Sequence, residues 1–562
     1  MSSAANTPLA LGIDYGTASG RVLVLDLVSG SELASVDVPY HHGVIDRELP
    51  GTGQRLGRDW ALQHPSDYLE VIEKGVPEAL QAAGADPARV IGLGIDFTSC
   101  TVLPVRADGL PLCLDERWSG HPHAWPKLWK HHAAQAQADR LTDLAVQRGD
   151  SFLARYGGKI SSEWYFPKLL EIYEQDRPVY DAAAAFIEAT DWIVWQLTGK
   201  ETRCSCAVSY KAFYSAEYGL PELSYFEAAA PGFSDSIRML GDLRTIRPLG
   251  SKAGFVNPEL ARKTGLGSAV AVAVGNVDSF VSVPGAGVSQ AGTLVTVVGT
   301  SICDMALHSD QVLLPGITGV VKDGILPGLY GYEAGQPAVG DMLGWYVGDL
   351  LGTARGDRGT CHERLEQESA GLAPGASGLV ALNWLNGNRS ILADAGLSGV
   401  IAGLTLSSTQ AEVYRALLES IAFASRRIVD NFTDHGLQIE RIVACGGIAE
   451  KSPLLMQMFA DITGRPVEVP GSSQIPARGA ALFGAVAAGT QSLPDSGFHG
   501  FDSIASAAAA LRPPTATAYT PRVNASSVYD RVYAVYRGLH DCFGREHADW
   551  MHQLKQIAEE NC

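Results

Sequence analysis

The sequence predicts an α/β protein in which one structural unit occurs twice along the chain. A Gly-Thr pair between two apolar segments appears at Gly16-Thr17 and again at Gly299-Thr300. In each half, a segment with helical spacing and then an apolar strand follow this pair. The chain has 562 residues, which exceeds the size of one ordinary hydrophobic core. These observations predict a duplicated fold with a boundary near residues 270–290.

The first half is expected to open with a strand, a tight turn and a second strand. Residues 9–13 and 21–25 are apolar and flank the first Gly-Thr pair, and residues 31–39 could add a third strand. Pro77 is able to kink the first helix, and Gly199 is suited to end the last one. The remaining elements expected here are helices at residues 66–83, 126–143 and 186–199, and a buried strand at residues 90–95.

The second half repeats this order. A long helix is expected to begin with Thr409-x-x-Glu412, a capping-box pattern. The apolar segment at residues 441–445 then mirrors the strand at residues 90–95. The other elements expected here are strands at residues 293–298 and 302–307, the long helix at residues 409–432, and a helical tail at residues 528–557.

Composition and charge indicate a cytoplasmic protein that binds neither nucleic acid nor membranes. The formal net charge of −18 disfavours both surfaces, since each selects for basic patches. The amino terminus lacks the basic and apolar regions of a signal peptide, and no apolar run reaches the roughly 18 residues that span a bilayer. The nine cysteines, with one lone pair at Cys204 and Cys206, are expected to be reduced thiols.

The two Gly-Thr pairs are candidate phosphate-binding loops. Glycine allows backbone N–H groups to approach a phosphate without obstruction by a side chain. One such turn alone would be interpreted as a plain hairpin, but two copies, each opening a repeat, favour a nucleotide site. Asp14 lies two residues before Gly16 and could bind Mg²⁺ through its carboxylate, because Mg²⁺ prefers one or two carboxylates together with nucleotide oxygens. The alternative for Asp14 is a residue that stabilises the turn.

Two further positions in the chain suggest nucleotide chemistry. Gly446-Gly447 ends an apolar strand and opens a helix, so its backbone could approach an adenosine closely, although an ordinary turn explains it equally well. Asp278 follows an apolar strand near the middle of the chain and could accept a proton from an attacking hydroxyl. The alternative for Asp278 is a helix N-cap.

Three residues are candidates for contact with a polyol-shaped ligand, namely Trp125, Lys211 and Glu333. Sugars are recognised by aromatic faces together with fixed donors and acceptors. Nothing in their bare spacing distinguishes these residues from a core tryptophan, a surface lysine and a surface glutamate. The pairs His41-His42 and His131-His132 are expected to be surface or packing residues rather than metal ligands.

Several longer motifs resemble the FGGY family of carbohydrate kinases, and most closely its bacterial L-ribulokinase branch. The resemblance covers residues from about 9 to 490. The family's second signature is softened at residues 386–404, where xylulose and glycerol kinases usually carry Gly-Glu-Arg, and this departure fits the ribulokinase branch. The matching motifs lie at residues 12–21, 94–101, 127–132, 156–164, 209–212, 275–278, 298–301, 332–336 and 444–452.

The resemblance implies an actin/hexokinase-like fold, in which duplicated ribonuclease-H-type domains flank an interdomain cleft. Residues 1–280 would form the sugar-binding domain with the first phosphate loop. Residues 281–495 would carry the second phosphate loop and the adenosine site, and residues 496–562 would be a helical extension.

The resemblance also implies a role for each candidate residue. Asp278 would be the catalytic base, and Asp14 would associate with Mg²⁺. The ATP-binding residues would be Gly16, Thr17, Gly299, Thr300, Gly446 and Gly447, and the sugar-binding residues would be Trp125, Lys211, Asp278 and Glu333.

The activity implied is ATP-dependent phosphorylation of L-ribulose at its C5 hydroxyl, in L-arabinose degradation. ATP and Mg²⁺ are the expected cofactors, and a homodimer is compatible with the resemblance. One alternative is a kinase for D-ribulose or xylulose. Another is a non-kinase ATPase of the same fold, although the roughly 70 residues after position 490 are too short and too helical for a chaperone's peptide-binding domain.

Overall fold

The computed structural model describes residues 7–57, 59–491 and 497–561. The chain forms two compact units, and both are discontinuous in sequence. The first unit comprises Met1–Ser289, Val321–Gly331 and Gln474–Pro513, and the second comprises Gln290–Val320, Tyr332–Ser473 and Pro514–Cys562. The segment Gln474–Pro513 therefore belongs to the first unit, although the sequence-based division places it in the second domain and the extension.

The first unit is built on a mixed seven-stranded sheet with the order β3-β2-β1-β4-β10-β9, in which β11 also pairs with β4. β1 and β2 form the antiparallel hairpin expected around Gly16-Thr17, and β4 runs parallel to β1. The strands are β1 (Leu9–Tyr15), β2 (Ser19–Asp26), β3 (Glu32–Pro39), β4 (Val90–Phe97), β9 (Lys252–Phe255), β10 (Ala271–Ala273) and β11 (Asn276–Val277).

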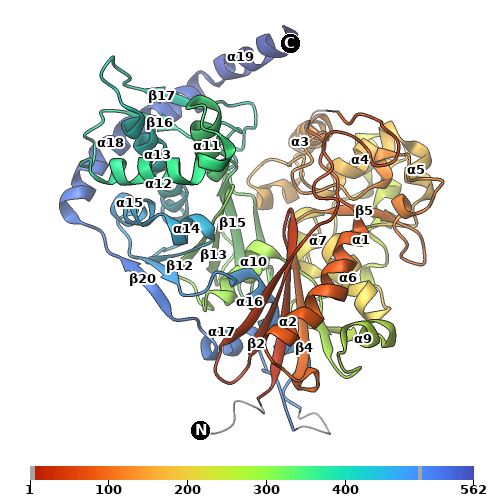
Figure 1. Ribbon diagram of the computed structural model, residues 1–562. Helices are drawn as coiled ribbons and strands as arrows, with labels where there is room; N and C mark the ends of the chain where they lie inside the picture. The colour runs from red at the N-terminus through yellow and green to blue at the C-terminus, as the bar shows by residue number, and fades with distance from the viewer. Residues whose placement is uncertain (1–6, 58, 492–496, 562) are drawn as a thin grey trace, which may run out of the picture. The chain divides into compact units, whose positions relative to one another are not determined.

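One helix from late in the chain lies directly on this sheet. Figure 1 shows α16 (Ile475–Ala488), drawn in blue, beside the red strands β2 and β4. The approach needs glycine, because a Cβ atom at Gly12 would lie 1.7 Å from the carbonyl oxygen of Ala477, and one at Gly94 would lie 1.8 Å from that of Ala480. This close packing explains why residues 474–513 join the first unit.

The rest of the first unit is mainly helical and has its own aromatic-rich core. This part also contains two pairs of short strands. β5 (Val102–Val105) pairs antiparallel with β6 (Ala185–Glu188), and β7 (Arg203–Cys204) pairs parallel with β8 (Ile246–Arg247). The α-helices of this unit, besides α16, are α1 (Pro65–Glu70), α2 (Val76–Ala82), α3 (Gln135–Arg148), α4 (Tyr165–Gln175), α5 (Arg177–Ala182), α6 (Ala189–Thr198), α7 (Ser205–Lys211), α8 (Leu223–Ala229), α9 (Pro258–Thr264), α10 (Asp278–Gly285) and α17 (Ile504–Ala510).

Two helix predictions in this unit need correction at their starts. The helix expected at residues 126–143 begins only at Gln135, because the preceding backbone bonds to distant segments: Lys127 N donates to Val102 O and Leu128 N to Ala61 O. The helix expected at residues 186–199 begins with strand β6 and becomes α6 at Ala189. Gly199 ends it in the left-handed conformation, as predicted.

The second unit repeats the arrangement of the first, which confirms the predicted duplication. Its sheet has the order β14-β15-β13-β12-β18-β19-β20, with β12 and β13 as the hairpin and β18 parallel to β12. The strands are β12 (Thr293–Val298), β13 (Ile302–His308), β14 (Gly319–Lys322), β15 (Tyr330–Gln336), β18 (Arg441–Cys445), β19 (Val467–Pro470) and β20 (Thr515–Tyr519), with β16 (Val380–Leu382) and β17 (Val400–Ala402) forming a separate pair.

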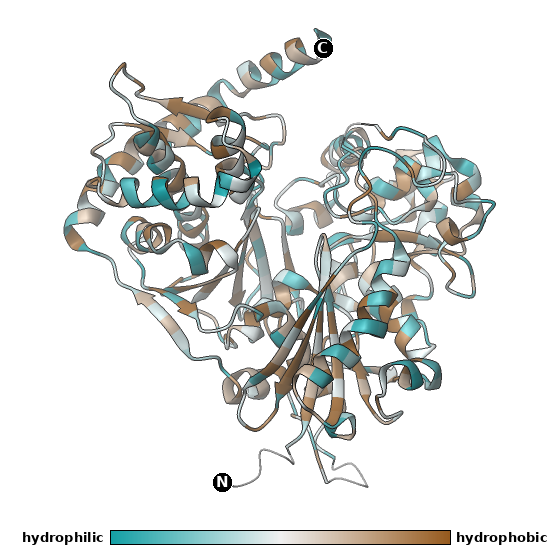
Figure 2. Ribbon diagram, in the orientation of Figure 1, coloured by the Kyte–Doolittle hydropathy of each residue, from teal (hydrophilic) through white to brown (hydrophobic). Residues whose placement is uncertain are grey.

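The long helix of the second unit, α13 (Gln410–Asp434), has the predicted capping box at Thr409 and Glu412. The tail expected to be helical contains α18 (Val523–Asp541) and α19 (Ala548–Glu560), separated by a π-turn at Cys542–Glu546. Figure 2 shows the strands of the first sheet mostly in brown and the polar α12 of the second unit mostly in teal. The other helices are α11 (Gly340–Trp345), α12 (Arg358–Ala370), α14 (Gly447–Lys451) and α15 (Pro453–Thr463).

The cysteines and the helices of the described residues agree with the sequence in two respects. The eight cysteines among them are all free thiols. None of the described helices combines the length and the apolar character that a membrane span requires.

Candidate active site

Three carboxylates meet at one edge of the sheet in the first unit. Asp14 on β1 is in register with Asp96 on the parallel strand β4. β11 also runs parallel to β4, with Asn276 opposite Asp96, and Asp278 follows directly as the first residue of α10. The next residues along β1 and β4, Tyr15 and Phe97, stack on the opposite face with ring centroids 5.0 Å apart. The alternation of side chains along strands therefore directs Asp14 and Asp96 to the same face.

Asp14 and Asp278 have different surroundings. One oxygen of the buried Asp14 carboxylate is 2.9 Å from Nη1 of Arg21, whose Nε also contacts Asp37. Asp278 is half-buried, and its Oδ1 accepts a hydrogen bond from the backbone N–H of Ser279 at 2.6 Å. The N-cap of α10 is Val277, so Asp278 does not have the capping position considered as an alternative.

Asp96 is a further site candidate, which lies within the motif at residues 94–101 but was given no role from the sequence. It is fully buried, and neither carboxylate oxygen has a hydrogen-bond partner among the described residues. Burial raises the pKa of this carboxyl well above its ordinary value, and the nearby carboxylates of Asp14 and Asp278 raise it further. The available signal was the matching pattern Gly-Ile-Asp at residues 12–14 and 94–96.

The first Gly-Thr loop is closed by its own backbone and held by two side chains. The N–H of Gly16 donates to Ser19 O at 2.9 Å. The indole N–H of Trp129 donates to the hydroxyl of Thr17 at 3.1 Å, and the amide of Gln63 donates to Thr17 O at 2.8 Å. Sequence reasoning missed both supports, because residues 46 and 112 positions away cannot be assigned to a turn from local pattern alone.

The second Gly-Thr loop has the same backbone closure, with the N–H of Gly299 donating to Ser301 O at 2.9 Å. Val339 N donates to Thr300 O at the start of α11, which anchors the loop. Gly446 follows β18 beside β12 and has a φ of 96°, and a Cβ atom there would lie 2.7 Å from Val298 O. The second unit thus brings Gly446-Gly447 next to the Gly299-Thr300 loop.

Lys211 lies at the end of α7 among three aromatic rings of the first unit. Its Nζ is 6.0 Å from the ring centroid of Trp164, 5.8 Å from that of Tyr210 and 6.0 Å from that of Phe280. Phe280 belongs to α10, two residues after Asp278. The fold therefore places Lys211, which is 3% exposed, near the start of α10.

Trp125 and Glu333 are both buried, in different units. The indole N–H of Trp125 donates to Ser119 O at 3.0 Å, so this side chain offers its ring face rather than its N–H. The rings of His64 and Trp125 form a T-shaped pair with centroids 5.3 Å apart. Glu333 lies on β15 of the second unit, and its backbone carbonyl accepts a hydrogen bond from Thr318 N. Trp125 belongs to the same aromatic-rich core as Trp164, the neighbour of Lys211.

Comparison with known proteins identifies the family of this chain. A model of the FGGY family of carbohydrate kinases, C-terminal domain, matches residues 294–488. The chain is 46% identical to the ribulokinase of Halalkalibacterium halodurans over 558 residues, which cover 98% of each chain. The chain belongs to the FGGY family of carbohydrate kinases. It is also 46% identical to the ribulokinase of Geobacillus thermodenitrificans, over 98% of this chain and 97% of that one.

The fold of this FGGY kinase is shared by solved structures that are far less similar in sequence. The xylulose kinase of Rhodospirillum rubrum superposes with a TM-score of 0.77 at 23% identity, covering 97% of this chain and 100% of that chain. The predicted actin/hexokinase-like α/β fold is thereby confirmed.

The residues of the kinase fit the Mg²⁺ ion that usually accompanies ATP in this family. Mg²⁺ binds hard oxygen ligands, commonly one or two carboxylates, and keeps several waters. Asp14 provides such a carboxylate, and the partnerless oxygens of Asp96 lie beside it. A second group, His42, His64 and Asp67, has ligand atoms within 4.8 Å of one another. It fits Mg²⁺ poorly, because two of its ligands are nitrogens and the two imidazole rings are stacked at 3.9 Å.

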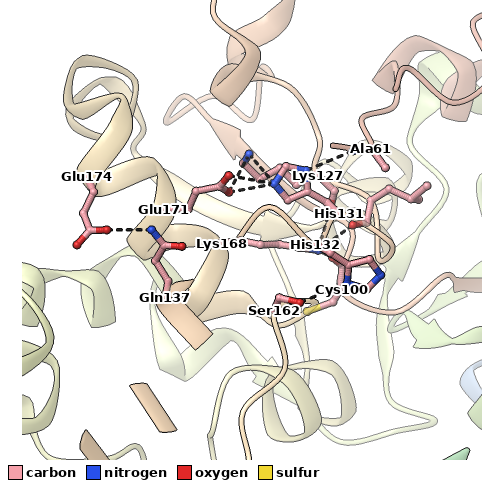
Figure 3. A network of polar contacts seen from close by, with 11 residues as sticks. Ala61, Cys100, Lys127, His131, His132, Gln137, Ser162, Lys168, Glu171 and Glu174 are labelled. Atoms are coloured by element: carbon pink, nitrogen blue, oxygen red, sulfur yellow. Dashed lines mark hydrogen bonds and ion pairs between the residues drawn. The ribbon is translucent and has the colours of Figure 1, made fainter. Parts of the chain in front are cut away.

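A buried ion-pair network supports the segment that carries Trp125 in the kinase (Figure 3). Nζ of Lys127 lies 3.1 Å from Oε2 of Glu171, which is also 3.0 Å from Nε2 of His131. Nζ of Lys168 donates to the backbone oxygens of Cys100 and Leu128, at 2.7 and 2.9 Å. The network ties the residues after β4 to those after Trp125. His131 is therefore a packing residue, as the sequence analysis expected.

The charges of Lys127 and His131 depend on the carboxylate of Glu171 that both contact. Burial lowers the pKa of Lys127 to about 8 and that of His131 to about 3, and the Lys127 charge lowers the latter further. Burial alone would raise the pKa of Glu171, but Lys127 and His131 hold it below its ordinary value. Glu171 is paired with Lys127, so at neutral pH Lys127 carries the charge and the buried His131 is neutral.

The kinase is expected to lose stability on mild acidification. The pKa of His123 and that of His131 are each lowered to about 3 by burial, so both stay neutral in the folded state at pH 5. In the unfolded chain both histidines bind a proton below about pH 6.5. Each therefore lowers the free energy of unfolding by about 1.4 kcal/mol per pH unit below that value. Thermal melts at pH 7, 6 and 5 should show a steadily falling midpoint. A midpoint that stays constant down to pH 5 would contradict these assignments.

Proposed function

We propose that this kinase transfers the γ-phosphoryl group of ATP to the C5 hydroxyl of L-ribulose, in L-arabinose degradation in the cytoplasm. The observation that carries the proposal is the placement of Lys211 near the start of α10, where Asp278 lies. A cation and a carboxylate in one aromatic-lined region suit a polyhydroxylated ligand with a reactive hydroxyl. The similarity to ribulokinases over nearly the whole chain supports the choice of sugar.

In this proposal, Asp278 orients the C5 hydroxyl and takes its proton. The hydroxyl oxygen forms a bond to the γ-phosphorus as the bond from that phosphorus to the bridging oxygen of ADP breaks. The proton leaves on the Asp278 carboxyl, and ADP takes the electron pair of the broken bond. When bound, Mg²⁺ neutralises charge on the phosphate oxygens, and Asp14 would hold it.

Phosphate binding is assigned to the two Gly-Thr loops and adenosine binding to Gly446 and Gly447. Trp129 and Gln63 fix the first loop through Thr17, so its N–H groups are oriented before the nucleotide binds. On the sugar, Lys211 would donate hydrogen bonds to hydroxyl groups and Glu333 would accept them. Trp125 would supply an aromatic face, since its N–H already has a partner.

A panel of sugars tests this proposal. ADP release by the purified kinase should be measured with L- and D-ribulose, L- and D-xylulose, ribitol and glycerol, each with ATP and Mg²⁺. L-ribulose should give the highest kcat/KM. A preference for D-ribulose or D-xylulose would assign the enzyme to another ketopentose. ATP hydrolysis that no sugar stimulates would instead indicate a non-kinase ATPase.

A further inference from the structure

We propose that Asp96 is a second protein ligand of the divalent cation, acting together with Asp14. This inference rests on the proposed function in one respect: the cation is taken to bind together with ATP or ADP. It concerns a residue on β4 to which neither the family resemblance nor the sequence reasoning gave a role.

The sheet brings the two carboxylates together. Asp14 and Asp96 occupy equivalent positions on adjacent parallel strands, two residues after Gly12 and Gly94 respectively. Adjacent strands lie about 4.8 Å apart, so in-register side chains on one face are direct neighbours. Ionised carboxylates only accept hydrogen bonds, so Asp14 cannot serve as a hydrogen-bond partner for an ionised Asp96.

Asp96 does not receive the hydrogen bonds that a buried carboxylate normally accepts. Both of its oxygens are without a hydrogen-bond partner among the described residues, although the side chain is fully buried. Asn276 is in register with Asp96 on β11 and 1% exposed, but its amide nitrogen donates to neither oxygen. Such groups are rare in folded proteins, and each costs free energy unless something else satisfies it.

The charge balance of the edge points to a cation as the missing partner. Strand register places Asp14 and Asp96 side by side, and Asp278 follows the strand that pairs with β4 beside Asp96. Arg21 is ion-paired with Asp14 and with Asp37, so its charge is already shared. A buried carboxylate that nothing pairs is strongly unfavourable. A divalent cation bound by Asp14 and Asp96 would remove this imbalance and would still leave Asp278 available as the base.

Isothermal titration of the full chain with ADP, with and without Mg²⁺, tests this assignment. The ratio of the two affinities measures how strongly the cation supports nucleotide binding. Asp96→Asn keeps the shape of the side chain and should reduce this ratio at least about tenfold. Asp191→Asn is the matched control, because Asp191 is an equally buried carboxyl that accepts a hydrogen bond from Cys204 N. The control should keep the ratio of the wild type.

A ligand exchange separates a direct ligand from a nearby charge. Thiolates prefer softer metals, so in Asp96→Cys the ion Cd²⁺ should strengthen ADP binding at least about tenfold more than it does in the wild type. Asp191→Cys should show no such gain. Without metal, Asp96→Asn should melt no lower than the wild type, since it removes a buried carboxyl that has no partner.

Three results would overturn the inference. One is an unchanged Mg²⁺ effect in Asp96→Asn, even if turnover falls. Another is a smaller Mg²⁺ effect on ADP affinity in Asp96→Asn together with no strengthening of ADP binding by Cd²⁺ in Asp96→Cys. That result would mean that Asp96 acts on the cation through its charge and does not bind it directly. A third is a metal-free melt of Asp96→Asn well below that of the wild type, which would assign the carboxyl to the fold. A wild type that does not bind ADP would contradict the proposed function itself.

Discussion

Asp278→Asn should lower kcat by at least about 10²-fold while leaving the fold intact. The amide keeps the shape of the side chain, and its oxygen can still accept the hydrogen bond from Ser279 N. It cannot take the proton of the sugar hydroxyl, so proton transfer loses its acceptor. Initial rates of ADP release at saturating ATP and L-ribulose measure the effect, and circular dichroism checks the fold.

Asp235→Asn is a suitable control for this variant. Asp235 pairs with Arg238 on the surface, away from the three-carboxylate edge, so kcat should remain that of the wild type. Turnover of Asp278→Asn close to the wild type would show that another group accepts the proton. A large rise in the KM for L-ribulose without a fall in kcat would limit Asp278 to sugar binding.

Gly94→Ala should destabilise the first unit by at least about 3 kcal/mol. The added Cβ atom would lie 1.8 Å from Ala480 O, and the opposing group is helix backbone, which cannot rotate away. α16 would have to move off the sheet, and the Asp14–Asp96 edge would be disturbed with it. Equilibrium unfolding in urea, followed by far-UV circular dichroism, measures this loss.

Gly120→Ala is the matched control for Gly94→Ala. A Cβ atom at Gly120 would meet no heavy atom within 4 Å, so its unfolding midpoint should stay near that of the wild type. Equal midpoints for Gly94→Ala and the wild type would mean that α16 does not pack on the sheet as closely as described.

The local parts of the fold could be predicted from the sequence. The two Gly-Thr turns became the β1–β2 and β12–β13 hairpins, and the capping box at Thr409 begins α13. These features depend on residues a few positions apart. The local conformational preferences of these residues favour the same structure that the complete fold contains. The duplication could be inferred for the same reason, because both copies contain the same local signals in the same order.

The features that depend on long-range contacts were harder to predict. Residues 126–134 have a helix-like pattern, but the backbone of Lys127 bonds to Val102, and tertiary contacts override the local preference. The return of α16 to the first unit depends on close packing against glycines more than 380 positions earlier in the chain. Asp96 became visible as a site residue only when strand register placed it beside Asp14.

The kinase is expected to phosphorylate the C5 oxygen of L-ribulose. The furanose ring of this sugar closes through the C5 oxygen, so a 5-phosphate is held in the open-chain keto form. Phosphorus and carbon NMR of the product formed from L-ribulose, ATP and Mg²⁺ should show a phosphate coupled to the C5 protons and a free ketone carbon. A product that keeps its furanose ring, with phosphate on another oxygen, would contradict the claim.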